Sequence, residues 1–343
     1  MRPRRSAKTT DQRAGEVGIL RRLEAAARRG ASNGSLLLGL GDDAALWRPS
    51  PGHQTILTCD WFLEGTHFLR DKHPPDCVGW KCLARALSDV AAMGGIPRCF
   101  LLSLALPMSH TGGWLNHFLG GLSRASCRFG CPLAGGDTTR RQQILISVTA
   151  VGEVRSGQAL LRRGARPGHV LFSSGRLGEA ELGLQLVRQC RGRMRSSNAL
   201  LRQHLYPEPR LALGQWLAQK RIASAMMDLS DGLSTDLARL CAESCVGARI
   251  FSDRLPAVRI PARLNFARED ALAFALHGGD DYELLFAVPP DKVRLVPTSL
   301  RGVPLTRIGE ITGRKAVVLR DAAGHERPLP AHGWDPFRDN GRA

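Results

Sequence analysis

The stretch VGWKCLARALSDVAAMGG, residues 78–95, is the segment that most constrains the fold. Its apolar residues recur every three or four positions, which predicts an amphipathic helix over residues 78–93 that ends at the Gly-Gly pair. We expect Asp76 to cap the start of this helix. Asp89 falls on the apolar face, where an unpartnered charge would cost several kcal/mol. This carboxylate therefore indicates either a functional site or an ion pair.

Asp89 belongs to one of six short acidic clusters that are flanked by Gly, Ser or Thr and spread along the chain. Surface carboxylates normally lie among Lys and Arg on helices, whereas these adjoin apolar runs and turn residues. Several of them could converge on hard cations, without which a carboxylate cluster would repel itself. The clusters are Gly41-Asp42-Asp43, Thr58-Cys59-Asp60, Ser88-Asp89, Gly135-Gly136-Asp137-Thr138-Thr139, Asp228-Leu229-Ser230-Asp231-Gly232 and Gly278-Gly279-Asp280-Asp281-Tyr282-Glu283.

Two clusters of the first half have positions that favour ligand binding. Asp60 ends a predicted strand over residues 55–60, and ligand sites in α/β proteins favour strand ends. The alternative for Asp60 is to cap the next turn. The glycines 135–136 allow close approach of a phosphate, and Asp137 with the two Thr residues suits the ligand shell of a metal.

Two further clusters lie in the second half. Asp228 and Asp231 are three residues apart at a predicted strand-to-helix turn, where free helix amides favour an anion. Capping of that helix by Ser230 or Asp231 is the alternative. Residues 278–283 precede a predicted strand and could also form an acidic hairpin turn.

The composition excludes several classes. A chain of 343 residues is long enough for about two domains. No run approaches ~20 apolar residues and no apolar stretch follows the basic N-terminus, so we expect a cytoplasmic protein without a membrane span or signal peptide. The nine cysteines lack zinc-knuckle spacing and the histidines show no His-Glu-x-x-His pattern. We therefore expect reduced thiols and no zinc site.

A net charge of +17 and a pI near 10.5 would ordinarily suggest nucleic acid. Residues 1–30, however, hold nine basic and three acidic residues, and no zinc finger, basic zipper or RNA-recognition motif is present. We expect residues 1–14 to be a disordered basic arm that is dispensable for function, with nucleic-acid contact as the alternative. A basic surface also attracts anionic nucleotides.

The pattern along the chain predicts an α/β protein of two domains. A polar stretch over residues 153–168 separates the halves, so we place one domain at 15–155 and the other at 156–343. The predicted helices are 16–29, 78–93, 114–129, 179–188, 210–218 and one through 237–240. The predicted strands are 55–60, 100–106, 144–151, 170–173, one running into 228, one near 249 and 282–288.

In order and spacing, the six clusters closely resemble thiamine-monophosphate kinase, a family of the aminoimidazole-ribonucleotide-synthetase-like superfamily. The match runs from Gly15-Glu16 to Gly333-Trp334-Asp335. The resemblance implies transfer of the γ-phosphoryl group of ATP to thiamine monophosphate, with several Mg²⁺ ions. It also implies a homodimer in which two N-terminal domains form a β-barrel, and a C-terminal α/β sandwich.

The resemblance assigns residues to three roles. Metal ligation, with the carboxylates as catalytic groups, is assigned to Asp43, Thr58, Cys59, Asp60, Asp89, Asp137, Asp228 and Asp231. ATP binding is assigned to Gly136, Asp137, Arg162 and Ser230, and binding of the thiamine end to His67, Asp280 and Trp334. Cys59 stands where the family more often has Thr, Asp280 replaces the usual Glu, and Trp61-Phe62 replaces smaller residues.

Other interpretations fit less well. No Gly-Lys-Ser or Gly-Lys-Thr follows Gly175-Arg176-Leu177-Gly178, which disfavours a P-loop protein. Within the superfamily, a selenophosphate synthetase would have a reactive Cys near its start, and a hydrogenase-maturation protein would end in Cys. A non-catalytic nucleotide- or nucleic-acid-binding protein of the same fold is the alternative from another class. The full set of metal-type carboxylates argues against it.

Overall fold

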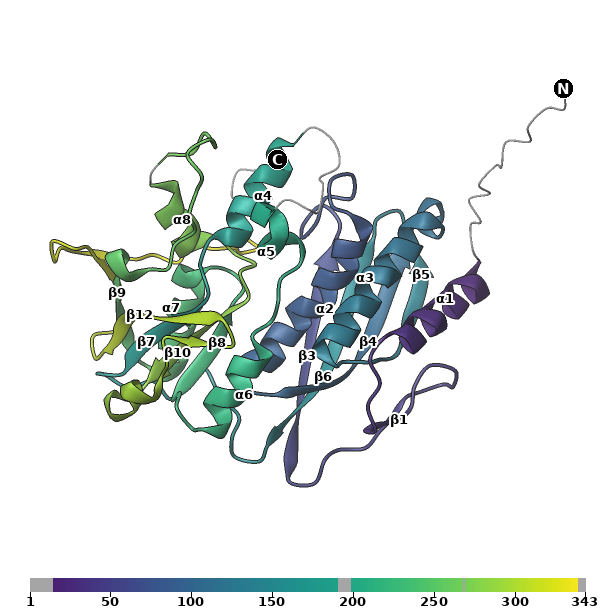
Figure 1. Ribbon diagram of the computed structural model, residues 1–343, viewed down its shortest axis with the longest axis horizontal. Coiled ribbons are helices and arrows are strands. Elements are labelled where there is room, and N and C mark those ends of the chain that lie inside the picture. Colours follow the sequence, from purple (N-terminus) through teal and green to yellow (C-terminus); the bar gives the residue numbers. More distant parts are fainter. Residues whose placement is uncertain (1–14, 191–198, 268, 339–343) are drawn as a thin grey trace, which may run out of the picture.

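The computed structural model describes residues 15–190, 199–267 and 269–338 and shows a two-domain α/β protein with mixed sheets (Figure 1). The basic arm 1–14 lies outside the described residues. Within the described ranges, no helix is long and apolar enough to cross a bilayer.

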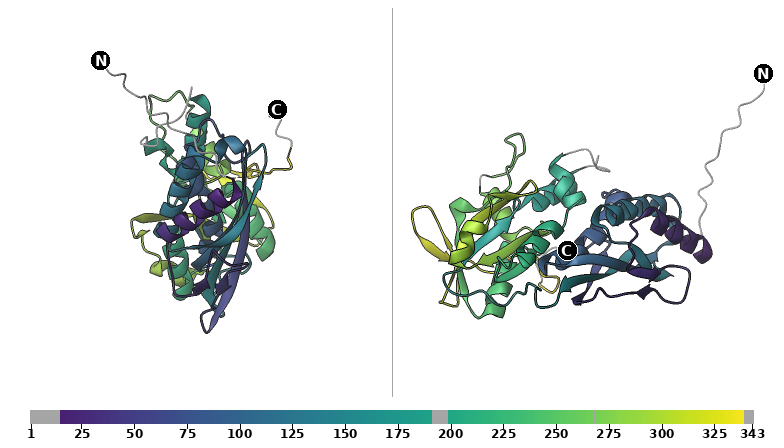
Figure 2. Two further views of the ribbon diagram at one scale, coloured as in Figure 1. Left: turned by 90° about the vertical axis from the view of Figure 1, so that its right-hand side faces the viewer. Right: turned by 60° about the horizontal axis from the view of Figure 1, so that its bottom comes forward.

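The first domain is an open four-stranded sheet in the order β3-β6-β4-β5, antiparallel except for the parallel pair β4 and β5. Helices α2 and α3 cover one face of this sheet, and the views in Figure 2 show no helix over the other. Its elements are α1 (Glu16–Arg29), β1 (Leu36–Leu38), β2 (Leu46–Trp47), β3 (His53–Leu63), α2 (Pro75–Ala92), β4 (Ile96–Leu106), η1 (Met108–His110), α3 (Gly113–Phe129), β5 (Leu133–Arg140) and β6 (Leu145–Arg155).

Alternation along the strands separates a core face from an open face. On β3, Ile56 and Phe62 are buried against α2 and α3. Leu57 and Trp61 lie on the opposite face and are 71% and 57% exposed. Leu101 of β4 lies on the same open face, because the register aligns it with β6 opposite Cys59 of β3. The open face therefore carries exposed apolar side chains on the edge strand β3 and on the inner strand β4.

Two glycines let α2 and α3 pack at close range. A Cβ atom on Gly79 would lie 2.0 Å from the carbonyl oxygen of Phe118, and one on Gly121 would lie 1.8 Å from that of Asp76. No heavy-atom contact is this short, so only glycine fits at either crossing point. The close contact fixes α2, the helix that carries Asp89.

The second domain contains an eight-stranded mixed sheet in the order β14-β13-β9-β12-β7-β10-β8, with β11 paired to β12. Every residue of β7, β8 and β10 is buried, since helices cover both faces. Its strands are β7 (Val170–Ser174), β8 (Ala225–Leu229), β9 (Gly247–Phe251), β10 (Glu283–Val288), β11 (Ser299–Leu300), β12 (Val303–Thr312), β13 (Val317–Arg320) and β14 (Glu326–Pro328). Its helices are α4 (Glu179–Gln189), η2 (Ala199–Leu201), α5 (Arg202–Leu205), α6 (Leu211–Gln219), α7 (Leu233–Ser244), η3 (Ser252–Arg254), α8 (Asp270–His277) and η4 (Pro290–Leu295).

Helix α2 belongs to both cores. Its residues Ala91 and Ala92 pack in the same cluster as Leu217 of α6 and Phe286 of β10. A Cβ atom on Gly214 would lie 2.0 Å from the carbonyl oxygen of Ala91, so α2 and α6 are also in close contact. The end of α2 that carries Asp89 is thereby fixed at the junction of the two domains.

The predicted helices and strands are present, with some boundaries wrong. Strand β3 continues to Leu63, so Asp60 lies inside the strand and not at its end. Asp76 is in the first turn of α2 and not its cap, which is Pro74. Its carboxylate instead accepts hydrogen bonds from Arg124 and Tyr206. Strands β11 to β14 were not predicted. Strands β11, β13 and β14 have only 2, 4 and 3 residues, and a register shift between Arg307 and Gly309 interrupts the alternation in β12.

Candidate active site

Strand β3 and helix α2 bring two predicted metal-binding segments together. The hydroxyl of Thr58 donates to the Asp89 carboxylate at 2.5 Å. Asp60, two residues along the same face of β3, is largely buried, and burial raises its pKa to about 6. Arg85 lowers this pKa, whereas the nearby charges of Asp89, Asp231 and Asp280 raise it further. Four carboxylates from both domains therefore share one electrostatic environment.

Asp228 joins this group from strand β8. Its side chain is buried, and the hydroxyl of Ser88 donates to it at 2.7 Å across the domain junction. Burial, followed by the charge of Asp89, raises the pKa of Asp228 to about 8. Burial is thus the first cause of both raised pKa values, and the charges of neighbouring carboxylates add to it.

The turn after β8 places Asp231 beside the C-terminal segment. The backbone N–H of Trp334 donates to the carbonyl oxygen of Asp231 at 2.8 Å. Arg239 pairs with the carboxylates of Asp231 and Asp236. Asp236 also accepts from the backbone N–H groups of Asp231 and of Gly232 at 3.0 and 3.1 Å. Asp236 thus caps α7 from within, and neither Ser230 nor Asp231 does so.

Asp280 lies on the same junction and faces two cations of α2. The ammonium of Lys81 is 2.9 Å from one carboxylate oxygen, and the Tyr282 hydroxyl donates to the other at 2.6 Å. A guanidinium nitrogen of Arg85 is 3.8 Å from Asp280. Although burial opposes ionisation, Lys81 and Arg85 hold the pKa of Asp280 well below its usual range. The backbone φ of Asp280 is +67°, and this turn of the chain points the Asp280 side chain in a different direction from that of Asp281.

The other acids of this segment are structural, and the segment is not a hairpin turn. Asp281 accepts from the backbone N–H groups of Gly178 and Ala180, at 2.6 and 3.1 Å, and so caps α4. Glu283 begins β10 and pairs with Arg210. Only Asp280 of this cluster faces the junction.

His67 lies close to the same two cations. Its Nδ1 accepts from the backbone N–H of Leu63 at 3.0 Å, and its ring packs near Phe62. Burial and then the charge of Arg85 lower the pKa of His67 to about 4. The ring is therefore neutral at pH 7 and able to pack against another ring.

Comparisons with known proteins identify the family of this chain. Residues 41–154 match the family model AIR synthase related protein, N-terminal domain, and residues 166–322 match AIR synthase related protein, C-terminal domain. Thiamine-monophosphate kinase of Escherichia coli strain K12 is 37% identical over 310 residues, covering 88% of this chain and 92% of that one. The chain belongs to the thiamine-monophosphate kinase family. The members of this family are phosphotransferases.

Two solved structures extend the match to the fold. The thiamine-monophosphate kinase of Stenotrophomonas maltophilia K279a is 37% identical, with a TM-score of 0.76 over 87% of this chain and 94% of that one. AaThiL complexed with AMPPCP and TMP is 30% identical, with a TM-score of 0.73 over 94% and 97% of the two chains. The second structure contains an ATP analogue together with TMP.

Several residues assigned by the family resemblance do not join the cluster in this structure. Asp43 and Arg162 are exposed, and no contact of their side chains with the other assigned residues is present in the described part of the chain. Asp137 pairs in register with exposed Ser103, which places it on the open face of the sheet. Gly136 has a structural reason to be glycine, because a Cβ there would lie 1.9 Å from the Leu102 carbonyl oxygen.

Cys59 also points away from the cluster. Its thiol lies 3.3 Å from the Ser147 hydroxyl on the open face, whereas its neighbours Thr58 and Asp60 face α2. The Cys59 thiol therefore does not join the carboxylate cluster. Across the described ranges, no three His, Cys, Asp or Glu side chains already stand in a metal-binding arrangement.

Two residues of this site were missed in the sequence. Lys81 and Arg85 lie on the face of α2 that carries Asp89, and the spacing of four between 81, 85 and 89 is the signal that identifies this stripe. It was overlooked because Lys and Arg are normally read as solvent-exposed helix residues. Here Lys81 is only 1% exposed.

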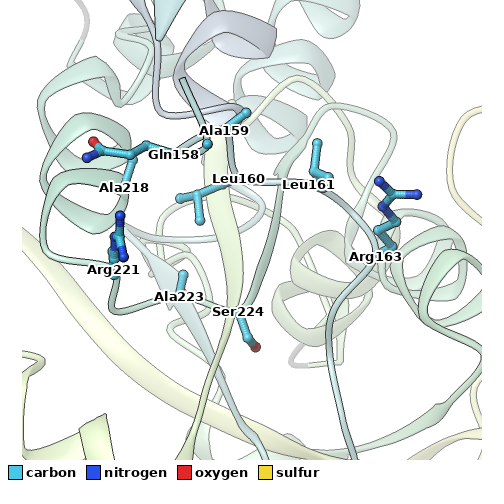
Figure 3. Close-up of a pocket in the computed structure, with 10 residues that line it drawn as sticks. Gln158, Ala159, Leu160, Leu161, Arg163, Ala218, Arg221, Ala223 and Ser224 are labelled. Carbon is cyan, nitrogen blue, oxygen red and sulfur yellow. The ribbon is translucent and has the colours of Figure 1, made fainter. Parts of the chain in front are cut away.

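A pocket of the described residues lies elsewhere (Figure 3). It has a volume of about 300 Å³ and is lined by residues 157–161 and Arg163 of the interdomain stretch and by residues next to the start of β8, including Arg221 and Ser224. The carboxylates lie at the other end of β8 and do not line this pocket, whereas Arg162, assigned to ATP, lies in the chain between two lining residues.

Proposed function

We propose that this chain transfers the γ-phosphoryl group of ATP to the phosphate of thiamine monophosphate, giving thiamine diphosphate and ADP. The observation that carries the proposal is the meeting of Asp60, Asp89, Asp228 and Asp231 at the domain junction. A site with this excess of negative charge suits a reaction that uses divalent cations between phosphates. The relatives named as thiamine-monophosphate kinases specify the substrates.

The reaction is an in-line displacement. An oxygen of the acceptor phosphate forms a bond to the γ-phosphorus while the bond from that phosphorus to the β-bridging oxygen breaks, and ADP leaves with the electron pair. Little covalent chemistry is required of the protein, so positioning and charge neutralisation supply the rate.

The donor set fits Mg²⁺, which prefers carboxylate oxygens. We assign its binding to the four junction carboxylates and Thr58, joined by Asp43, Asp137 and the carbonyl of Cys59. When bound, Mg²⁺ would neutralise charge on the transferring phosphoryl group and on the phosphates beside it. We assign ATP to Gly136, Asp137, Arg162 and Ser230, and the thiamine end of the acceptor to His67, Asp280 and Trp334.

The chain's own hydrogen bonds orient these carboxylates. Thr58 fixes the Asp89 carboxylate from β3, and Ser88 fixes Asp228 from α2. Arg239 contacts Asp231 from within its own domain. These three carboxylates are thus each held by a neighbour before any cation arrives, which reduces the reorganisation needed on binding.

We also propose that two chains pair through the open faces of their first sheets to form a β-barrel dimer. The open face carries the exposed apolar side chains of Leu57, Trp61 and Leu101. Strands β3 and β5 are the edges of the sheet, and a barrel would pair them. We place the domain boundary between residues 155 and 156, after the last strand of the first sheet.

The test is to incubate the full chain with ATP, Mg²⁺ and thiamine monophosphate and to separate the products by chromatography. We expect thiamine diphosphate and ADP in equal amounts, and no diphosphate when Mg²⁺ is chelated. We also expect free thiamine to be a poor acceptor, since its hydroxyl would lie one phosphate short of the transferring group. A folded, metal-supplied chain that makes no thiamine diphosphate would contradict the proposal.

A further inference from the structure

The guanidinium of Arg85 lies between two parts of the site that bind different groups. One terminal nitrogen is 4.0 Å from Asp60, and the other is 3.8 Å from Asp280. The guanidinium carbon also lies 5.4 Å from the centre of the Phe62 ring. The Phe62 ring and the two carboxylates fix the position of the guanidinium and leave part of its edge uncovered.

The hydrogen-bonding capacity of this guanidinium is mostly unused. A hydrogen bond from N–H to oxygen spans about 2.7–3.2 Å, so neither carboxylate accepts a normal one from Arg85. Its Nε is buried and has no hydrogen-bond partner within the described ranges. The side chain as a whole is only 15% exposed. Buried donors are almost always satisfied, and an unsatisfied one indicates a ligand or water that completes its shell.

The charge of Arg85 remains despite burial. Burial opposes the charged form, but Tyr282, Asp280, Asp60 and Asp231 raise its pKa above the ordinary value. A planar guanidinium with free, desolvated donors binds the oxygens of a phosphate in pairs. The same pairing is not offered by Lys81, whose ammonium is already 2.9 Å from Asp280.

We propose that Arg85 binds the phosphate of the acceptor and thereby selects thiamine monophosphate over thiamine. This inference rests on the proposed function, which places metal-bound phosphates at Asp60 and the thiamine end at Asp280. In-line transfer requires the acceptor phosphate to lie between these two parts, and Arg85 occupies that position. No other described cation spans both carboxylates.

The test measures binding of two probes without turnover. Thiamine monophosphate and thiamine are titrated calorimetrically into the Mg²⁺-supplied full chain in the absence of ATP, for the wild type, Arg85→Gln, Arg85→Lys and Arg98→Gln. Arg98 is the matched control, because it is also partly buried and pairs with a carboxylate, Glu153, at the far end of the sheet. Thermal unfolding checks that each variant is folded.

We expect Arg85→Gln to weaken binding of thiamine monophosphate by about tenfold to a hundredfold, as for a lost charged hydrogen-bonded pair, and to leave thiamine binding unchanged. Arg85→Lys should lose several-fold in affinity for thiamine monophosphate, because lysine keeps the charge but not the planar set of guanidinium donors. Arg98→Gln should keep the wild-type preference for the monophosphate.

An Arg85→Gln variant that keeps the wild-type preference for the monophosphate overturns the inference. Equal weakening of the binding of both probes also overturns it and would indicate a purely structural role of Arg85. Should that variant not fold, wild-type affinity for the monophosphate in Arg85→Lys overturns it. A wild type without kinase activity contradicts the proposed function instead, so the two failures are distinguishable.

Discussion

Single residues set the charge of the site through short contacts between side chains on different elements. Thr58 donates to Asp89 and Ser88 donates to Asp228, so each carboxylate is oriented by a hydroxyl from another strand or helix. Both contacts leave the carboxylates ionisable and able to accept further ligands. In the proposed function, the negative charge of these carboxylates holds the cations that neutralise the phosphates.

Asp89→Asn keeps the shape and the Thr58 hydrogen bond while removing one charge. We expect kcat to fall by about a hundredfold or more, because the site loses a carboxylate that would hold the Mg²⁺ whose charge offsets phosphate repulsion. The measurement is the steady-state rate of thiamine diphosphate formation at saturating substrates. Asp76→Asn, on the same helix but paired with Arg124 and Tyr206, is the control and should keep near-normal kcat. Near-normal turnover in Asp89→Asn would refute its metal role.

Asp280→Ala should affect both stability and acceptor binding. Loss of the carboxylate leaves the buried Lys81 ammonium without its partner, which costs about 3–5 kcal/mol when an ion pair is broken on one side. We expect a lower midpoint in urea unfolding and a higher KM for thiamine monophosphate, with the KM for ATP nearly unchanged. Asp280→Glu should keep acceptor affinity. Loss of ATP affinity in the alanine variant would show that Asp280 is not at the acceptor end.

The sequence could predict which segments form the site but not which residue of a segment faces it. In the run 280–283, the positive φ values at Asp280 and Tyr282 decide that Asp280 points to the junction and Asp281 to α4. Residue type alone does not encode that choice, because Asp and Tyr rarely adopt this conformation. The roles of Lys81 and Arg85 likewise depend on a domain contact that no local pattern contains.

At the scale of elements, α2 determines the geometry because it packs against three neighbours at once. Its N-terminal half contacts α3 through glycines, and its C-terminal half contacts α6 and β8 of the other domain. The helical period and the Gly-Gly stop were enough to predict this helix to within about three residues. The close contacts of α2 with α3 and α6 were not predictable, since no sequence pattern shows which neighbour a helical glycine packs against.

Adjacent glycines of α3 provide a matched test of this packing. Gly121→Ala would place a Cβ 1.8 Å from the Asp76 carbonyl oxygen and force α3 away from α2. Overpacking of this kind costs about 1–3 kcal/mol or more. Gly120→Ala meets only the end of Arg124 at 3.9 Å and should stabilise by about 0.5–1 kcal/mol through helix propensity. Urea unfolding measures both, and equal effects would contradict the close contact.

The contact between α5 and the loop before α2 contains a buried histidine pair. The Nε2 atoms of His73 and His204 are 3.0 Å apart, and both rings are almost fully buried. Burial lowers the pKa of His73 to about 4 and that of His204 well below its ordinary value. In the unfolded chain both groups titrate near 6.5. As the pH falls through 6.5, the unfolded state therefore gains protons before the folded state does.

The free energy of unfolding should then be highest above pH 6.5 and decrease as the pH falls towards 4. The decrease is about 3 kcal/mol for a pKa shift of the size given for His73. The double variant His73→Gln/His204→Gln should show a smaller slope between these pH values in urea titrations. His117→Gln, at an exposed position of α3, is the control and should keep the wild-type slope. An unchanged slope in the double variant would contradict the assignment.

At the scale of the whole molecule, the site exists only where the domains meet. Asp60, Arg85 and Asp89 come from the first domain, and Asp228, Asp231 and Asp280 come from the second. The order of the motifs along the chain predicted the family and the two-domain architecture. It could not predict that the register places Asp137 on the open sheet face, since a shift of one residue in pairing reverses the face of every side chain.

The open face leads to the last prediction, which concerns assembly. Leu57 and Trp61 are 71% and 57% exposed on the open face of the edge strand β3, where water contact of apolar side chains is unfavourable. Substituting Leu57→Asp and Trp61→Glu together would bury charges in the proposed dimer, so we expect light scattering after gel filtration to show a monomer where the wild type is a dimer. Leu295→Asp, at a position 52% exposed in the second domain, should leave the dimer intact. A dimer that persists in the double variant, or a wild type that is monomeric at micromolar concentration, would contradict pairing through this face.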